Sequence, residues 1–334
     1  MAAVRIGNDK TSKWGYIDKA GHFAVNPQFD GATAFAEGFA PVRIGDDKTG
    51  KVGYIDKTGH LAVNPQFDVI NSWDFWTGES DIEFSDGLAA VRIGDYNMGK
   101  VGYIDKAGHF TVNPQFDDAG QFSDGLAAVQ IGDDKTGRWG YIDKAGHFAV
   151  NPQFDWAAPF SGGIARVQVG RDKTGKWGFI DKTGHFVVNP QFGLAADFED
   201  GLAAVRVGDD KTGKWGFVDK TGHFAVNPQF EWAWEFVEGL ASVQIGDDKT
   251  GKHGYIDKAG HFAVNPQFDW ASPFSGGVAA VQIGDDKTGK WGYINKYGHY
   301  VVNPQFDWAG PFKDGLAAVR IGDSTSGKYG YISR

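Results

Sequence analysis

The sequence predicts an all-β protein made of tandem 38-residue antiparallel β-meander repeats, nine hairpins in all, stacked as an open β-solenoid or superhelix. Three observations carry this prediction. A short signature centred on a Trp-Gly pair recurs at constant spacing, and Asn-Pro-Gln-Phe recurs eight times. Glycine is also abundant, with 49 residues among 334, while aromatic residues make up 15%. A unit of this length lies below the ~40 residues at which a domain usually folds alone, so each copy has to bury its apolar face against its neighbours.

The glycine of the signature gives the period. Consecutive copies are 38 residues apart, except that 49 residues separate Gly53 from Gly102. The difference is an insertion of 11 residues within about 69–84. The nine glycines are Gly15, Gly53, Gly102, Gly140, Gly178, Gly216, Gly254, Gly292 and Gly330. We therefore interpret 1–334 as a single repeat domain.

The unit at 87–116 shows how one copy is expected to fold. Alternation in 88–93 places Ala89, Val91 and Ile93 on one face, as a half-buried strand requires. A short second strand follows at 100–104 and a third at 109–112, joined by turns in which Asp accepts backbone bonds and Gly supplies a positive φ. Asn-Pro is then expected to end the pairing, because Pro has no N–H to donate. About ten further residues form an irregular crossing to the next unit.

The ends of the array favour an open arrangement. There are nine copies of the two-strand hairpin but eight of the Asn-Pro-Gln-Phe strand, so the array finishes with the same element at both ends. The alternative is a closed eight- or nine-bladed β-propeller-like ring. Four-stranded blades of about 40 residues are common, and the crossing segment could supply a fourth strand.

The repeated motif resembles a known family. Lys-Trp-Gly-Tyr-Ile-Asp-Lys at 13–19 returns at 290–296 with one change, and Pro-x-Phe-Asp followed by Phe and Gly-Leu-Ala lies downstream. These residues are similar to the WG-repeat family of bacterial proteins over essentially the whole chain. The resemblance implies a repeat protein and carries over no catalytic residues. The Trp is replaced by Val52, Val101, His253 and Tyr329 in four units, which indicates a packing position.

Composition narrows the function. The chain has no cysteine, which removes disulfides, thiolate nucleophiles and Cys-ligated metals. Its net charge of -9 argues against nucleic-acid binding, and no apolar run approaches the ~20 residues of a membrane helix. Met1 leads directly into repeat sequence with no visible signal peptide. The cytoplasm is the default location, and a secreted or surface location is the open alternative.

Two repeated polar features bear on metal binding. Eight of the nine histidines occupy one repeat position, after the glycine of the second turn, where stacking could align them as metal ligands or a pH-responsive row. No second ligand type clusters beside them, so we interpret them as solvated residues flanking a turn. Asp-Asp-Lys-Thr-Gly, as at 46–50, lacks the alternating oxygen ligands of a calcium loop. No metal and no cofactor are expected.

Aromatic residues outside the signature are the binding candidates. Trp follows Phe-Asp or Phe-Glu in four crossings and could form a row of exposed rings for a partner or a sugar, or else an inter-unit core contact. The acidic, aromatic insertion at 69–84 could anchor an interface or fold back as local core. The candidate residues are Trp73, Phe75, Trp76, Trp156, Trp232, Trp270 and Trp308.

Catalysis has little support in the sequence. Near-identical units place the same Asp, Lys and His in the same surroundings, whereas an active site needs groups in unlike environments. We therefore expect a non-catalytic binding scaffold for a protein or peptide, with the 69–84 segment supplying specificity. One alternative is a multivalent carbohydrate or cell-envelope binder that uses the repeated Trp residues. Another is a structural protein that self-associates weakly through its terminal edge strands.

Overall fold

The computed structural model describes residues 1–334 apart from 8–10, 47–48, 69–81, 96–97, 134, 172–173, 248, 286, 314, 324–325 and 334. The described residues form strands and turns and contain no α-helix. Contacts divide the chain into two compact units. The first comprises Met1–Arg171 and Ile180–His185, and the second comprises Asp172–Phe179 and Phe186–Arg334. The interpretation of 1–334 as one domain stays a prediction.

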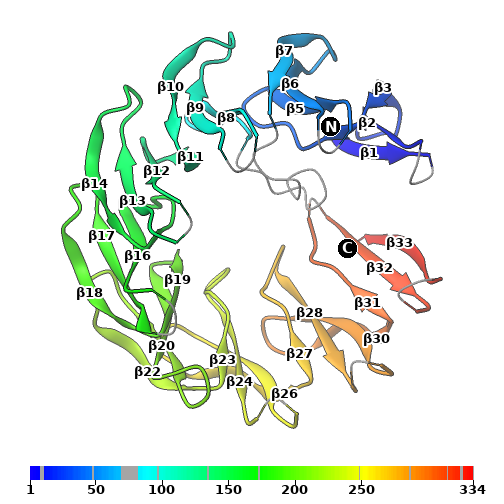
Figure 1. Ribbon diagram of the computed structural model, residues 1–334. Coiled ribbons are helices and arrows are strands. Elements are labelled where there is room, and N and C mark those ends of the chain that lie inside the picture. The colour runs from blue at the N-terminus through cyan, green and yellow to red at the C-terminus, as the bar shows by residue number, and fades with distance from the viewer. Residues whose placement is uncertain are drawn as a thin grey trace. The chain divides into compact units, whose positions relative to one another are not determined.

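The strands follow one another at the spacing of the sequence repeat (Figure 1). The first unit holds β1 (Ala2–Ile6), β2 (Lys13–Ile17), β3 (Phe23–Phe29), β4 (Gly31–Ala32), β5 (Phe39–Ile44), β6 (Lys51–Asp56), β7 (Leu61–Phe67), β8 (Ala89–Ile93), β9 (Lys100–Ile104), β10 (Phe110–Phe116), β11 (Asp118–Ser123), β12 (Leu126–Ile131), β13 (Arg138–Ile142), β14 (Phe148–Phe154), β15 (Trp156–Ala157) and β16 (Ile164–Val169). β17 (Lys176–Asp181) has residues in both units.

The second unit holds the remaining strands. They are β18 (Phe186–Phe192), β19 (Leu194–Glu199), β20 (Leu202–Val207), β21 (Lys214–Val218), β22 (Phe224–Phe230), β23 (Trp232–Ala233), β24 (Ala241–Ile245), β25 (Lys252–Ile256), β26 (Phe262–Phe268), β27 (Trp270–Ala271), β28 (Val278–Ile283), β29 (Lys290–Asn295), β30 (Tyr300–Phe306), β31 (Trp308–Ala309), β32 (Leu316–Ile321) and β33 (Lys328–Ser333).

These strands form nine small antiparallel sheets, six of four strands and three of three over the described residues. Within each sheet the strands pair in chain order, as in β11-β12-β13-β14, and no sheet continues into the next among the described strands. An open solenoid would instead carry its sheets from repeat to repeat. The solenoid prediction is therefore wrong, and the propeller-like alternative fits, because a four-stranded antiparallel meander is the blade of a β-propeller.

Two local predictions also need correction. The crossing is not wholly irregular, since it supplies the first strand of most sheets, such as β4 or β11. Asn-Pro does not end the outer strand either, because β10 continues through Asn113 and Pro114 to Phe116. The pairing of β10 with β9 shifts register between Val112 and Phe116, and β10 is the last strand of its sheet. At an edge with a register shift, the missing N–H of Pro interrupts no ladder bond.

Inner strands such as β8 are buried on both faces, which differs from the half-buried strand that alternation predicted. Ala89, Ala90, Val91 and Arg92 of β8 are all buried, and Ile93 at the strand end is exposed. A strand between two neighbouring sheets presents both sets of side chains to protein, so its alternation is lost. One core cluster accordingly contains residues of successive sheets, from Val52 to Ile142.

Buried tyrosines connect successive sheets. In six units the Tyr that follows the signature glycine donates its hydroxyl to a carbonyl near the start of the next sheet. Tyr141 of β13 donates to the carbonyl of Ala158 at 2.7 Å, and Tyr255 of β25 donates to that of Ser272 at 2.7 Å. A buried hydroxyl without such a partner would be costly, so these bonds fix the spacing of neighbouring sheets.

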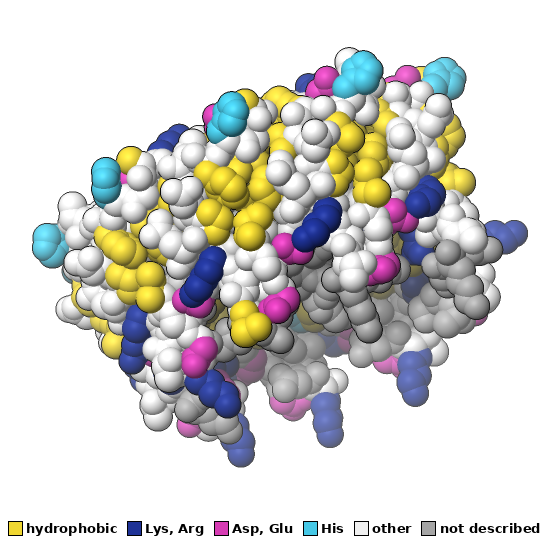
Figure 2. All heavy atoms as spheres, turned by 45° about the horizontal axis from the view of Figure 1, so that its top comes forward, with side chains coloured by type: hydrophobic (Ala, Val, Ile, Leu, Met, Phe, Trp, Pro, Cys, Tyr) yellow, Lys and Arg dark blue, Asp and Glu magenta, His cyan; other side chains and the backbone are white. Residues whose placement is uncertain are grey.

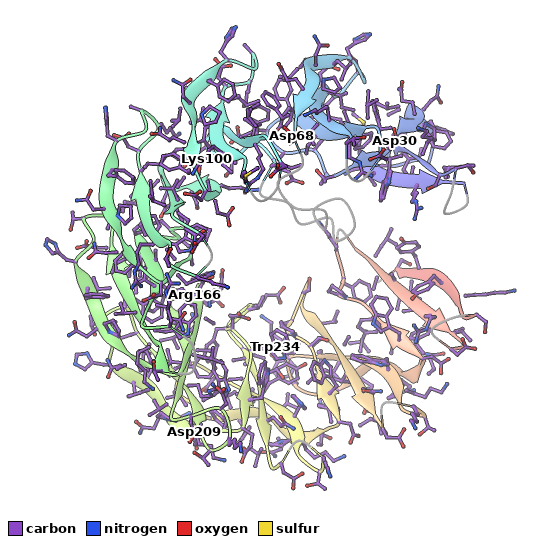
Figure 3. The ribbon with its side chains drawn as sticks, in the orientation of Figure 1. Asp30, Asp68, Lys100, Arg166, Asp209 and Trp234 are labelled. Atoms are coloured by element: carbon purple, nitrogen blue, oxygen red, sulfur yellow. The ribbon has the colours of Figure 1, made fainter. Side chains whose placement is uncertain are left out.

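Repeated carboxylates make a second connection (Figure 3). Asp117 accepts from Lys100 Nζ in β9 at 2.5 Å and from the backbone N–H of Gly132, which follows β12 in the next sheet, at 2.8 Å. Partial burial would raise the pKa of Asp117, but these bonds outweigh it and hold the pKa below its usual value. The same double contact is made by Asp30, Asp68, Asp269 and Asp307, and by Asp155 with Arg138 in place of the Lys.

Candidate ligand-binding surfaces

The four crossing Trp residues begin the short strands β15, β23, β27 and β31. Trp232, Trp270 and Trp308 are 37–39% exposed, and Trp156 is half-buried. Each of the three also contacts a ring: the centroid of Trp232 lies 5.4 Å from that of Trp215, and the centroid of Trp308 lies 6.1 Å from that of Tyr329. These rings are therefore partly exposed and partly packed, which lies between the row of exposed rings and the inter-unit core contact considered from the sequence. A ring that packs against protein on one side still leaves surface open to a partner.

The insertion is only partly described. Trp73, Phe75 and Trp76 lie outside the described residues. Its last residues belong to the core, since Ile82 and Phe84 are each 2% exposed. The ring of Phe84 lies 5.0 Å from Tyr54 and 5.4 Å from Phe39, centroid to centroid. The C-terminal end of the 69–84 segment therefore packs as local core.

A pocket of about 640 Å³ opens in the second unit, between the sheet β23–β26 and the sheet β27–β30. Trp232 and Trp270, from the first strands of the two sheets, both line it. Its other lining residues are Gln244, Lys249, Gly251, His253, Asp269, Gly284 and Asp285. The volume lies in the range of about 300–1,000 Å³ that is typical of small-ligand sites. The structure thus brings two of the candidate Trp residues to one concave site.

His253 is the buried polar residue of this pocket. It occupies the signature Trp position in β25, is 2% exposed, and its ring centroid lies 5.2 Å from that of Trp270. Burial lowers the pKa of His253 from 6.5 to about 4, although the nearby Asp269 carboxylate opposes the shift. The imidazole is therefore neutral at pH 7. The sequence indicated a packing position here, and the pocket was missed because it needs residues of two sheets.

Trp234 extends the aromatic cluster (Figure 3). Its ring centroid lies 6.2 Å from that of Trp232 and 6.4 Å from that of Trp270. The sequence did carry a signal for it, since Trp234 is the second Trp in a crossing where the other crossings have one Trp or none in the aligned segment. A pattern of recurrence does not single out such a departure.

The outer strands present a second repeated surface. Figure 2 shows histidine side chains standing out at intervals, with hydrophobic patches between them. All eight turn-flanking histidines are exposed, in agreement with their interpretation as solvated residues: His22, His60, His109, His147, His185, His223, His261 and His299. The backbone N–H of each donates to the side-chain oxygen of an Asp or Asn four residues earlier, as His109 does to Asp105 at 2.9 Å.

The residue after each of these histidines is large and apolar or aromatic, yet it is exposed. These side chains are 38–47% exposed: Phe23, Leu61, Phe110, Phe148, Phe186, Phe224, Phe262 and Tyr300. Several pack edge-on against a buried Phe of the preceding sheet, as Phe148 does against Phe116 with 6.3 Å between centroids. The outermost strand has no further strand to cover it, so half of each side chain remains in solvent.

Other features of the described residues add two observations. No group of three or more His, Cys, Asp or Glu side chains among them is arranged to hold a metal ion. Within the same residues there is no helix with the length and apolarity needed to cross a membrane.

Comparison with known proteins identifies the family. The WG-containing repeat matches residues 14–48, 53–74, 102–134, 139–173, 177–211, 215–249, 254–287 and 291–332. The chain therefore belongs to the family of WG-containing repeat proteins, and the resemblance predicted from the sequence is confirmed. No curated protein sequence matches the chain.

Solved structures resemble the fold at low identity. One, described as the crystal structure of the eukaryotic initiation factor, is 14% identical, covers 89% of this chain and 83% of its own, and has a TM-score of 0.58. The β-propeller domain of the Trilobed protease from Pyrococcus furiosus is 8% identical over 80% of this chain and 94% of its own, with a TM-score of 0.36. The first likeness shows the fold alone, and with the nine blade-like sheets it assigns the chain to the β-propeller class. A repeat fold of this class favours a binding scaffold.

Proposed function

We propose that the chain is a non-catalytic binding scaffold whose partner is a protein or peptide. The supporting observation is the half-exposed apolar side chain that recurs on the outer strand of successive sheets, as at Phe110 and Phe148. Repeated exposure of large apolar side chains beside polar ones is typical of a protein-interaction surface. The Tyr and Asp connections between sheets keep these side chains in place, so little freedom is lost when a partner binds.

The 69–84 segment is proposed to give this surface its specificity, with Trp73, Phe75 and Trp76 as anchors. A non-catalytic role is supported by the likeness of the units, because the turn carboxylates Asp105 and Asp143 share the same partners and the same lowered pKa. The net charge of -9 favours partners other than nucleic acid. We propose a cytoplasmic location, and the proposed function involves neither membrane insertion nor a cofactor.

The proposal is tested with peptides selected on the intact chain from a random-peptide display library. Two variants are compared with the parent: Phe110 and Phe148 both replaced by Ala, and Trp73, Phe75 and Trp76 all replaced by Ala. Each is expected to bind the selected peptides with an affinity at least tenfold lower, because apolar anchors carry most of the binding energy. The exposed neighbours His109 and His147, replaced together by Ala, serve as the matched control and are expected to leave affinity unchanged. Selected peptides that bind both aromatic variants as tightly as the parent would refute the proposal.

Self-association is a second candidate function, favoured by the last sheet. Tyr331 is 75% exposed there, whereas its repeat equivalents Tyr255 and Tyr293 in the second unit are buried against the following sheet. A second copy could cover this face and the edge of β33 that pairs with no other described strand. Sedimentation at increasing concentration is expected to show association that Tyr331→Lys abolishes. Strictly monomeric behaviour at high concentration would exclude this candidate.

A further inference from the structure

Three residues in or beside the sheet β23–β26 depart from the repeat, and one of them, His253, lines the pocket. Glu231 stands where six other units have Asp, and His253 stands where other units have Trp, Val or Tyr. Trp234 occupies a position that is small in six units and Ile in one: Thr33, Gly120, Ala158, Ala196, Ser272 and Gly310, with Ile82. The other units form the same sheet without these three residues, so the fold does not require them. We infer that they serve a function specific to this part of the chain.

Two buried polar atoms at this place have no hydrogen-bond partner among the described residues. One is Nδ1 of His253, whose ring lines the pocket, and the other is Nε1 of Trp234. A buried polar atom without a hydrogen-bond partner destabilises the folded chain. Trp Nε1 can only donate, whereas a neutral imidazole nitrogen donates or accepts. The pocket lining includes His253 but not Trp234, so a ligand in the pocket would meet the imidazole alone, and a hydroxyl could serve it as donor or acceptor.

The charges around the pocket balance one another. Asp269 accepts from Lys252 Nζ at 2.5 Å and from the N–H of Gly284 at 2.8 Å. Asp285 caps its own turn by accepting from the N–H of Thr288 at 2.8 Å, and Lys249 also lines the pocket. With the neutral His253 between them, these groups leave no net charge for an ionic ligand to neutralise. The pocket therefore suits an uncharged ligand.

The aromatic lining narrows the ligand further. Trp232 and Trp270 both line the pocket with about two fifths of their surface exposed. A pyranose ring offers an apolar C–H face to such indoles and hydroxyls that both donate and accept. We propose that this pocket binds the ring of a neutral sugar, with Trp232 and Trp270 against its apolar face and His253 meeting its hydroxyls. This binding is separate from the protein-binding function proposed above and does not depend on it.

The test is calorimetric titration of the full chain with neutral trisaccharides (maltotriose, cellotriose and chitotriose), and with glucuronic acid and glucosamine as charged probes. We expect at least one neutral trisaccharide to bind and both charged sugars to bind more weakly. Trp270→Ala and His253→Trp are each expected to weaken binding tenfold or more. His253→Trp restores the residue that five other units carry, so this variant is expected to keep the fold, and circular dichroism checks this.

Trp308→Ala is the matched control, because Trp308 has the same repeat position and a similar exposure but does not line the pocket. It is expected to leave sugar affinity unchanged. An equal loss of sugar affinity in Trp308→Ala and Trp270→Ala would overturn the proposed pocket site and favour binding by a multivalent row of Trp residues. Absence of binding to every neutral trisaccharide, tighter binding of a charged sugar, or unchanged affinity in His253→Trp would also overturn the proposal.

Discussion

A single methyl group added at Gly292 is expected to lower the free energy of unfolding by about 3 kcal/mol, the upper end of the cost of overpacking. A Cβ at this position would lie 2.5 Å from the carbonyl oxygen of Val302, 2.7 Å from the nitrogen of Pro304 and 2.9 Å from the carbonyl carbon of Asn303. All three are backbone atoms of the outer strand β30, which cannot turn aside as a flexible side chain could. Urea unfolding of Gly292→Ala against the parent measures the loss.

The last copy of the repeat provides a matched control. Gly330 occupies the same position in β33, but among the described residues no outer strand pairs with β33, and a Cβ there would meet nothing within 4 Å. Gly330→Ala is therefore expected to change stability by less than about 0.5 kcal/mol, as surface substitutions usually do. Equal losses in Gly292→Ala and Gly330→Ala would show that backbone freedom, and not the approach of the outer strand, makes glycine necessary.

This contact explains the constant glycine of the signature. The same crowding by the outer strand is found at Gly15, Gly53, Gly102, Gly140, Gly178, Gly216 and Gly254. The sequence displayed the glycine but not its reason, because the crowding strand lies ten or more residues further along the chain. The neighbouring Trp position varies to Val or His, since it meets side chains that can adjust.

Period, all-β class and turn chemistry could be predicted from the sequence because they depend on residues close together in the chain. Gly21 and Gly59, for example, have the positive φ that their turns require. The arrangement of the sheets could not be predicted in the same way. Whether strands pair onward into the next repeat depends on contacts between copies, and a count of hairpins does not distinguish the two outcomes.

The candidate binding residues show the same division. Trp232 and Trp270 were found because they recur, whereas His253 and Trp234 are departures from the repeat, and their meaning depends on their neighbours in two sheets. The exposure of Phe110 also differs from what the sequence predicts. Its apolar character predicts burial, but the outermost strand of a sheet has no neighbour to provide it.

Stability is expected to fall by about 2 kcal/mol between about pH 7.5 and pH 5 because of His253 alone. Its pKa is about 4 in the folded chain and 6.5 as an ordinary value. The unfolded chain therefore binds a proton on this imidazole at a higher pH than the folded chain does. Stability from this group is complete above about pH 6.5, decreases as the pH falls, and is fully lost below about pH 4, a total of about 3 kcal/mol.

His253→Trp isolates this contribution. The groups nearest the imidazole, Asp269, Asp285, Lys249 and Lys252, are present in both proteins, so their own titration cancels when the two unfolding curves are subtracted. The difference in free energy of unfolding between parent and variant, measured by urea at several pH values, is expected to follow the His253 titration alone. A difference that stays constant from about pH 7.5 to pH 5 would mean that the imidazole is solvated in the folded chain. The description of His253 as a buried residue of the pocket would then be wrong.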